Sequence, residues 1–298
     1  DPKMLTPQKK KQMIEAFGRA LKGIAPSLYV AGPDINTTEK EMGQIAIAAG
    51  SRKVCTGKPS SMGGIPHELG STGFGVAHSS LLALKYMGMN PSDARVAIEG
   101  YGNVGKFVHK YFSEWGIPVT AVSDSSGVIA DKRGLDYERL MQTKKEFGSV
   151  TKYRGKYAHK GSNILTAPAN VLVTAAIPDL VTMSNVHQLK HKLVVQGSNI
   201  SMSQGVENRL HSRGTLVIPD FVANAGGVIS SYVEHIGGTP KTMFKMVEGK
   251  IKKNVKLMFH EMDRAHLTPR DAAMRIAIAR VKQGKWKEFY PCPEPCLE

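Results

Sequence analysis

Five short apolar runs, each followed by glycine or polar residues, occupy the middle of the chain and limit its fold more than any other feature. The runs lie at residues 96–98, 119–122, 171–174, 193–195 and 216–218. Short apolar runs that alternate with helical stretches are typical of a parallel sheet with crossover helices. We therefore predict an α/β fold.

The loops that follow these runs are rich in small and polar residues. They lie at residues 100–105, 123–127, 174–178, 196–199 and 219–227. Open α/β sheets bind ligands outside the carboxyl ends of their strands. Turn chemistry would explain one such loop, but five in succession indicate a ligand site.

The sharpest motif is the glycine turn Gly100-Tyr101-Gly102-Asn103-Val104-Gly105, which follows an apolar run and precedes a helical run at 106–115. The first glycine of such a turn permits a tight bend, the second lets a pyrophosphate approach, and the third packs helix against strand. The phosphates then meet the positive end of a helix. We predict a Rossmann-type domain that binds a dinucleotide.

Asp124 ends the next run, where an acidic side chain accepts hydrogen bonds from the adenosine ribose hydroxyls. This favours NAD. Ser125, with further serines and Lys132 and Arg133 nearby, leaves room for a 2′-phosphate. The cofactor is therefore predicted as NAD or NADP, with Asp124 and Ser125 among its contacts.

Helical patterns flank the predicted sheet. Thr6-Pro7 marks a helix start, with Met13, Ile14, Phe17 and Leu21 on one face, and a short extended run follows at 27–30. After residue 227 we expect a helix over 243–262 and another that opens with Thr268-Pro269 and carries Asp271.

Composition narrows the class of protein. Nothing in the 298 residues is apolar enough to cross a bilayer, and three cysteines are too few for a disulfide framework, which favours a cytoplasmic location. The formal charge of +15 suggests nucleic-acid binding, but its basic clusters lie far apart and lack interleaved aromatic residues. A solvated surface that attracts anionic substrates is favoured, and no membrane or nucleic-acid partner is expected.

Two candidate metal pairs are weak. His187 and His191 stand four apart on a predicted helix without an evident third ligand, so a surface position is favoured. Cys292 and Cys296 lie in a proline-rich tail that we expect to be disordered. No metal site is predicted.

The sequence resembles the glutamate, leucine, phenylalanine and valine dehydrogenases, and within this family it is most similar to the glutamate branch. The resemblance runs in the family's order over nearly the whole chain. It is carried by Gly32-Pro33-Asp34-Ile35-Asn36-Thr37, Thr56-Gly57-Lys58-Pro59, Gly63-Gly64, Ser71-Thr72-Gly73-Phe74-Gly75, the glycine turn, Val122-Ser123-Asp124-Ser125, Gln196-Gly197-Ser198-Asn199 and residues 219–228.

The resemblance implies residue roles. Asp34 exchanges protons with the substrate nitrogen, Asn224 helps to hold the substrate, and Ser231 binds the side-chain carboxylate of glutamate, which favours a dicarboxylic substrate. Alternatives stay open, because Asp34 also suits a turn or helix cap, and Ser231 could fill space against the sheet. The remaining implied contacts are to the cofactor: Thr72 at the nicotinamide carboxamide, Ala175 in the loop after residue 174, Asn199 near the nicotinamide ribose, and Asn224.

The chain also departs from the family. The family's carbonyl-polarising and carboxylate-binding lysines lie upstream of the Asp-Pro pair that here is Asp1-Pro2, so we expect them outside this sequence and expect poor turnover without them. Ile65 stands where serine is usual, and Glu68 where arginine is usual. Pro178-Asp179 replaces a polar pair that ends in asparagine.

We therefore expect a remnant of a substrate and oligomerisation domain at 1–71, a dinucleotide-binding domain at 72–227, and C-terminal helices at 228–298 that pack back on the first domain. The implied reaction is reversible NAD(P)-dependent oxidative deamination of L-glutamate to 2-oxoglutarate and ammonia, in a homo-oligomer that is hexameric by resemblance. The alternatives are a non-catalytic or regulatory dinucleotide-binding protein, or a dehydrogenase of another amino acid.

Overall fold

The computed structural model describes residues 5–34, 36–153, 158–159 and 163–283. Cys292 and Cys296 lie outside these residues. No helix in the described ranges is both long and apolar enough to span a membrane.

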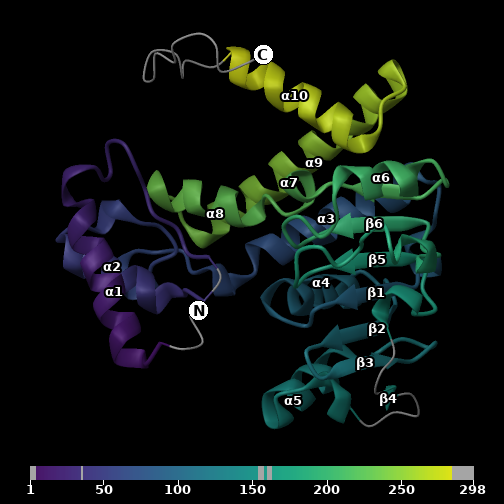
Figure 1. The fold of residues 1–298 in the computed structure, drawn as a ribbon, viewed down its shortest axis with the longest axis horizontal. Helices are drawn as coiled ribbons and strands as arrows, with labels where there is room; N and C mark the ends of the chain where they lie inside the picture. Colours follow the sequence, from purple (N-terminus) through teal and green to yellow (C-terminus); the bar gives the residue numbers. More distant parts are fainter. Residues whose placement is uncertain (1–4, 35, 154–157, 160–162, 284–298) are drawn as a thin grey trace.

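A seven-stranded sheet in the order β4-β3-β2-β1-β5-β6-β7 forms the larger lobe, on the right in Figure 1. The five strands predicted from the apolar runs are confirmed, and they pair in parallel. Two short antiparallel strands, β3 and β4, extend the sheet beyond β2 and were not predicted. The strands are β1 (Val96–Glu99), β2 (Val119–Asp124), β3 (Gly127–Ala130), β4 (Ala158–His159), β5 (Val171–Thr174), β6 (Leu193–Gln196) and β7 (Leu216–Ile218).

The sheet is buried on both faces, which explains why its strands are continuous apolar runs. Val96 and Ile98 belong to one apolar cluster and Ala97 to the other, because successive side chains point to opposite faces. The first cluster includes residues of α3, α4, α5 and α9, and the second includes residues of α6. These helices span α3 (Ser71–Tyr86), α4 (Asn103–Glu114), α5 (Tyr137–Phe147), α6 (Gln204–His211) and α9 (Pro240–Ala265).

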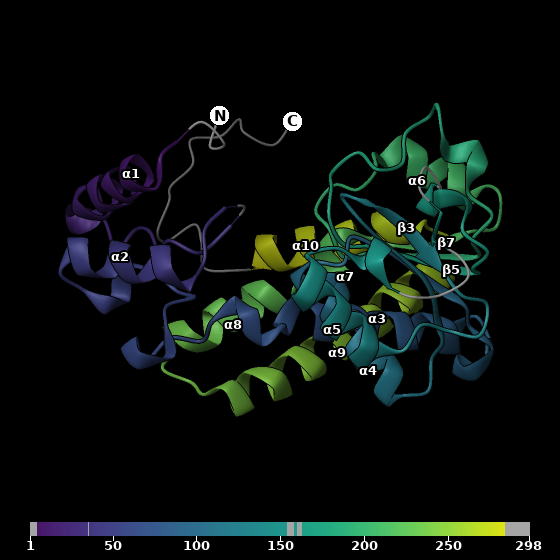
Figure 2. The same cartoon turned by 90° about the horizontal axis from the view of Figure 1, so that it is seen from below.

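A smaller lobe holds α1 (Pro7–Ala20) and α2 (Glu39–Ala49), on the left in Figures 1 and 2. The predicted start of α1 is confirmed, since Thr6 Oγ1 accepts a hydrogen bond from Lys9 N. Gly18 lets α1 approach α2 closely, because a Cβ there would lie 2.8 Å from the Ile45 carbonyl oxygen. The apolar face of α1 is only partly buried, with Met13 58% and Phe17 44% exposed.

The extended run predicted at 27–30 is wrong. Residues 24–28 form turns, in which Ala25 N bonds to Leu21 O and Leu28 N to Ile24 O. These local bonds replace a strand partner, and only Ala31 forms a bridge, to Cys55.

After the last strand and the four-residue helix α7 (Asp220–Ala223) come three longer helices: α8 (Gly226–His235), α9 and α10 (Pro269–Gln283). The two predicted C-terminal helices are confirmed, and Thr268 Oγ1 caps α10 by accepting from Asp271 N. Helix α8 lies between the lobes in both views, whereas α9 packs against α3, and α10 against α9 and β7. Among the described residues, α8 packs back toward the first lobe through Glu234, and the domain boundaries stay a prediction.

Short 3-10 segments complete the described chain: η2 (Leu21–Gly23), η3 (Arg52–Val54), η4 (Ser60–Met62), η5 (His67–Leu69), η6 (Pro91–Asp93), η7 (Val150–Lys152), η8 (Ile164–Thr166) and η9 (Val186–Gln188), with a four-residue helix α7 (Asp220–Ala223). The helix predicted through His187 and His191 is wrong, because only η9 forms there.

Candidate functional site

The glycine turn has the geometry that a dinucleotide requires. Gly100 has φ +86°, in the left-handed region that favours glycine. A Cβ at Gly105 would lie 2.1 Å from the Gly100 carbonyl oxygen, so no larger residue fits where α4 packs on the turn. A Cβ at Gly102 would meet nothing within 4 Å, which leaves this part of the turn open to a ligand. Asn103 and Val104 open α4, whose N-terminal amides suit a phosphate.

Asp124 turns its carboxylate into its own lobe. Oδ2 accepts from Lys144 Nζ at 2.6 Å and from Val150 N at 2.8 Å, and Oδ1 accepts from Ser126 N at 2.9 Å. Burial alone would raise the pKa of Asp124, but these hydrogen bonds outweigh it and hold the pKa below its usual range. Ser125 beside it is exposed. Both oxygens are therefore engaged before any ribose arrives.

Ala175 lies in the loop after β5, and a buried carboxylate positions it. Glu99, at the end of β1, accepts hydrogen bonds from Ala175 N at 3.0 Å and Ala176 N at 3.1 Å. Burial raises the pKa of Glu99 despite those amides. Sequence reasoning missed Glu99, although an acidic residue directly before the glycine turn was visible.

Asn199 and Asn224, from the loops after β6 and β7, lie in direct contact. Asn224 Nδ2 donates to Asn199 Oδ1 at 2.6 Å. Asp220 stabilises the loop of Asn199, because its Oδ2 accepts a hydrogen bond from Ile200 N at 2.9 Å. The two predicted amides thus converge at the carboxyl edge of the sheet.

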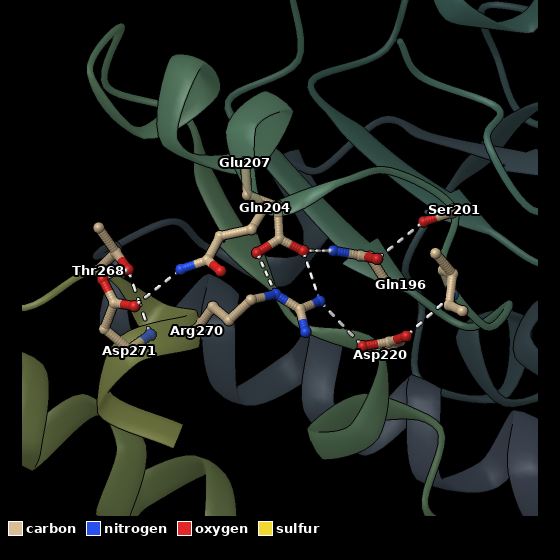
Figure 3. A network of polar contacts seen from close by, with 9 residues as sticks. Gln196, Ser201, Gln204, Glu207, Asp220, Thr268, Arg270 and Asp271 are labelled. Atoms are coloured by element: carbon tan, nitrogen blue, oxygen red, sulfur yellow. Dashed lines mark hydrogen bonds and ion pairs between the residues drawn. The ribbon is translucent and has the colours of Figure 1, made fainter. Parts of the chain in front are cut away.

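Arg270 of α10 links the supports of both loops (Figure 3). Its guanidinium bonds to Glu207 of α6, with Nε–Oε2 at 2.6 Å, and to Asp220 at 3.0 Å. Glu207 also accepts from Gln196 at the end of β6. The two carboxylates raise the pKa of Arg270 above its usual range, with Glu207 the larger contributor. These partners are distant in sequence, and nothing in the local patterns predicted the network.

Ser231 lies on α8 and faces the loop that leads into α3. Its Oγ is 3.4 Å from His67 Nε2. One turn further along α8, Glu234 is buried and accepts from Gly57 N at 2.8 Å, from Ile65 N at 2.6 Å and from Lys58 Nζ. One carboxylate of α8 therefore anchors the Gly-Lys-Pro segment at 57–59 and the residue that follows the Gly-Gly pair at 63–64.

Thr72, the second residue of α3, lies beside the start of α8. A Cβ at Gly227 would lie 2.9 Å from Thr72 Oγ1, so glycine is needed for this approach. Asp34 lies in a turn of the smaller lobe, where its amide donates to Thr37 Oγ1 at 2.7 Å. The Asp34 side chain is exposed, and its charge acts on His67.

The departures from the family pattern have distinct settings. Ile65 is 2% exposed and contributes its amide to Glu234, whereas Glu68 is exposed. Asp179 has φ +51°. His191 is buried rather than at the surface as predicted, and burial lowers its pKa to about 4. Within the described ranges, no group of three or more His, Cys, Asp or Glu residues is placed to hold a metal ion.

The structure thus places most of the predicted residues after the sheet strands. The glycine turn, Asp124, Ser125, Ala175 and Asn199 follow the ends of β1, β2, β5 and β6, and Asn224 follows α7 and contacts Asn199. Thr72 lies in the first turn of α3, Ser231 in the middle of α8 and Asp34 in the smaller lobe. His67, Glu234 and Lys58 were missed as a set, because they meet only in three dimensions.

Similarity to known proteins provides independent evidence about the family. The model of the Glutamate/Leucine/Phenylalanine/Valine dehydrogenase family matches residues 63–287. Glutamate dehydrogenase of Aeropyrum pernix is 34% identical over 300 residues, which cover 94% of this chain and 71% of the relative. NADP-specific glutamate dehydrogenase of Saccharolobus shibatae is 32% identical over 302 residues, with 94% and 70% covered.

A solved structure has the same fold. The hetero-hexameric glutamate dehydrogenase of Thermus thermophilus, with leucine bound, superimposes with a TM-score of 0.85 at 26% identity, covering 95% of this chain and 70% of that one.

Proposed function

This chain belongs to the glutamate/leucine/phenylalanine/valine dehydrogenase family, and we infer that it catalyses the reversible NAD(P)-dependent oxidative deamination of L-glutamate to 2-oxoglutarate and ammonia. The observation that carries this inference is the position of the glycine turn at the same sheet edge as the Asn199–Asn224 pair. A dinucleotide site and a polar substrate site are thereby adjacent, as hydride transfer requires.

The residues of this chain fit the cofactor. The open face at Gly102 would leave room for a pyrophosphate over residues 100–105, and the N-terminal amides of α4 would donate to it. Asp124 and Ser125 would lie at the adenosine ribose, and Ala175, Asn199 and Thr72 toward the nicotinamide. The bound cofactor supplies or accepts the hydride, and the protein orients it.

Substrate handling would fall to three side chains. Asn224 donates to the substrate, and the Ser231 hydroxyl hydrogen-bonds the side-chain carboxylate. Asp34 exchanges a proton with the substrate nitrogen, as general acid and base. Its exposure in this conformation is consistent with closure of the small lobe on the substrate, since water must leave before such a carboxylate acts efficiently.

The surface of the smaller lobe supports an oligomer. The similar Thermus thermophilus protein is a hetero-hexamer, and large apolar side chains lie exposed around α1 and α2 of this chain. They are Met13, Phe17, Ile24, Leu28, Tyr29 and Ile47. Several exposed apolar side chains on one lobe favour an interface between subunits there. We propose a homo-oligomer, with the hexamer as the expected form; a cytoplasmic location stays a prediction.

The test is turnover. In protein that also carries the two family lysines expected outside this sequence, we expect oxidation of NADPH or NADH with 2-oxoglutarate and ammonium, and a loss of about a hundredfold or more in Asp34→Asn with cofactor binding retained. Asp93→Asn, an exposed aspartate of η6, is the control. Ser231→Ala should lose about ten- to a hundredfold in efficiency with glutamate and less with norvaline. A protein that binds cofactor yet turns over no amino or 2-oxo acid would support the regulatory alternative.

A further inference from the structure

His67 occupies a position that both lobes determine. Its carbonyl oxygen accepts from Asn103 Nδ2, in the glycine turn, at 2.9 Å. Two residues earlier, the amide of Ile65 is held by Glu234 of α8 at 2.6 Å. The backbone that carries His67 is therefore fixed against the predicted cofactor turn on one side and against α8 on the other.

The imidazole lies between two glycines and points at Ser231. Cβ atoms built at Gly57 and Gly227 would lie 3.7 Å from His67 Cδ2 and 3.6 Å from Cε1. Its Nε2 is 3.4 Å from Ser231 Oγ, at the outer limit of a hydrogen bond. A ligand oxygen near Ser231 Oγ would thus find an imidazole nitrogen within reach.

Burial and the nearby charges act in opposite directions on the pKa of His67. Burial, the largest effect, lowers the pKa of His67, while the negative charges of Glu68, Glu234 and Asp34 oppose that shift. The charge of Glu234 is compensated by Lys58, its buried partner. Burial therefore favours the neutral ring, and a further anion in contact with it would favour the imidazolium.

We propose that His67 and Ser231 together recognise the side-chain carboxylate of a dicarboxylic 2-oxo acid, with His67 as the residue that determines specificity for the second charge. This rests on the function proposed above and deepens it. Binding of the dianion draws a proton from solvent onto the ring, so that a charged hydrogen bond replaces the long contact with Ser231. A monocarboxylic acid of the same length offers no anion there and leaves the ring neutral.

The test is calorimetric binding of 2-oxoglutarate and 2-oxopentanoate to protein that also carries the family lysines expected outside this sequence and that is saturated with NADPH. Three variants are compared with the wild type: His67→Ala, His67→Gln, and His235→Ala as a control at an exposed histidine at the end of α8. His67→Ala should weaken 2-oxoglutarate binding about ten- to a hundredfold and 2-oxopentanoate binding less than about threefold. His67→Gln, which keeps a donor but no charge, should recover part of the loss.

Proton uptake on binding distinguishes recognition of the carboxylate by His67 from a purely structural role of His67. Titrations at pH 8 in two buffers of different ionisation enthalpy should show protons taken up with 2-oxoglutarate in the wild type and in His235→Ala, but not in His67→Gln. Equal losses for both acids, or uptake unchanged in His67→Gln, would overturn the proposal while leaving the proposed function intact. Failure of the wild type to bind either acid would instead overturn the proposed function.

Discussion

Lys58 and Glu234, 176 residues apart in the sequence, form an ion pair with only 6% and 2% of their side chains exposed. Lys58 also donates to the Cys55 carbonyl, and Glu234 accepts two backbone amides. Burying two charges is costly, and full hydrogen bonding offsets that cost. The pair joins the smaller lobe to α8, and with it the segment that carries His67.

Lys58→Met should destabilise the fold by about 3–5 kcal/mol, because it leaves the Glu234 carboxylate buried without a counter-charge. Chemical denaturation measures the difference. Lys53→Met, at an exposed lysine of η3, is the control. If both variants unfold at the same denaturant concentration, the ion pair does not hold the lobes together.

Gly102→Val should abolish cofactor binding and leave the fold intact. The site is open around a Cβ and its φ is −92°, so the valine is accommodated by the protein but collides with a pyrophosphate. Fluorescence titration should show NADH and NADPH affinity reduced at least about tenfold, with a melting temperature within about 2 °C of wild type. Gly249→Val on α9 is the control. If Gly102→Val binds NADH and NADPH as tightly as the wild type, the cofactor does not bind over the glycine turn.

Lys144→Ala should shift cofactor preference toward NADH. Its ammonium compensates Asp124, and without it a bare carboxylate stands beside the place expected for a 2′-phosphate. We expect NADPH affinity to fall about three- to tenfold more than NADH affinity at low salt. Lys145→Ala, one residue along α5 and exposed, should change neither. Parallel losses for the two cofactors would show that Asp124 does not face the adenosine ribose.

Arg270→Met should cost about 3–5 kcal/mol of stability, because Glu207 and Asp220 then repel each other at a largely buried site. Since Asp220 also holds Ile200, beside Asn199, substrate affinity should fall as well. Arg275→Met, at a mostly exposed arginine of the same helix, provides the comparison. A destabilised variant with unaltered affinity for 2-oxoglutarate would restrict Arg270 to a structural role.

Glu41 should make stability depend on acidity. Burial would raise its pKa, but hydrogen bonds from Lys10 and Thr38 outweigh burial and lower the pKa to about 2. Because the folded pKa lies below the unfolded one, the stabilisation is complete above about pH 4.5 and is lost as the pH falls toward 2. Glu41→Gln should therefore cost about 1 kcal/mol at pH 7 and nothing near pH 2. A gap between the two denaturation curves that persists at pH 2 would contradict this, and Glu138→Gln serves as the control.

The strands and the glycine turn were predictable because each depends on neighbours in the sequence. A strand buried on both faces needs apolar residues throughout, and the turn needs glycine at Gly100 for its positive φ and at Gly105 for close packing. The same local logic gave the caps at Thr6 and Thr268. It failed at residues 27–30, where local turn bonds competed with a strand that had no partner.

What the sequence by itself determined is thus the α/β architecture, the dinucleotide turn and the family, since these follow from periodicity, backbone conformation and short motifs. Tertiary structure alone decided which charges meet. Asp124 is neutralised by Lys144, 20 residues away, and His67 reaches Ser231, 164 residues away. Which side chains pair across such sequence separations depends on how the helices, strands and lobes pack. Local sequence patterns therefore do not predict these pairs. The engagement of Asp124 and the contact of His67 with Ser231 therefore emerged only from the fold.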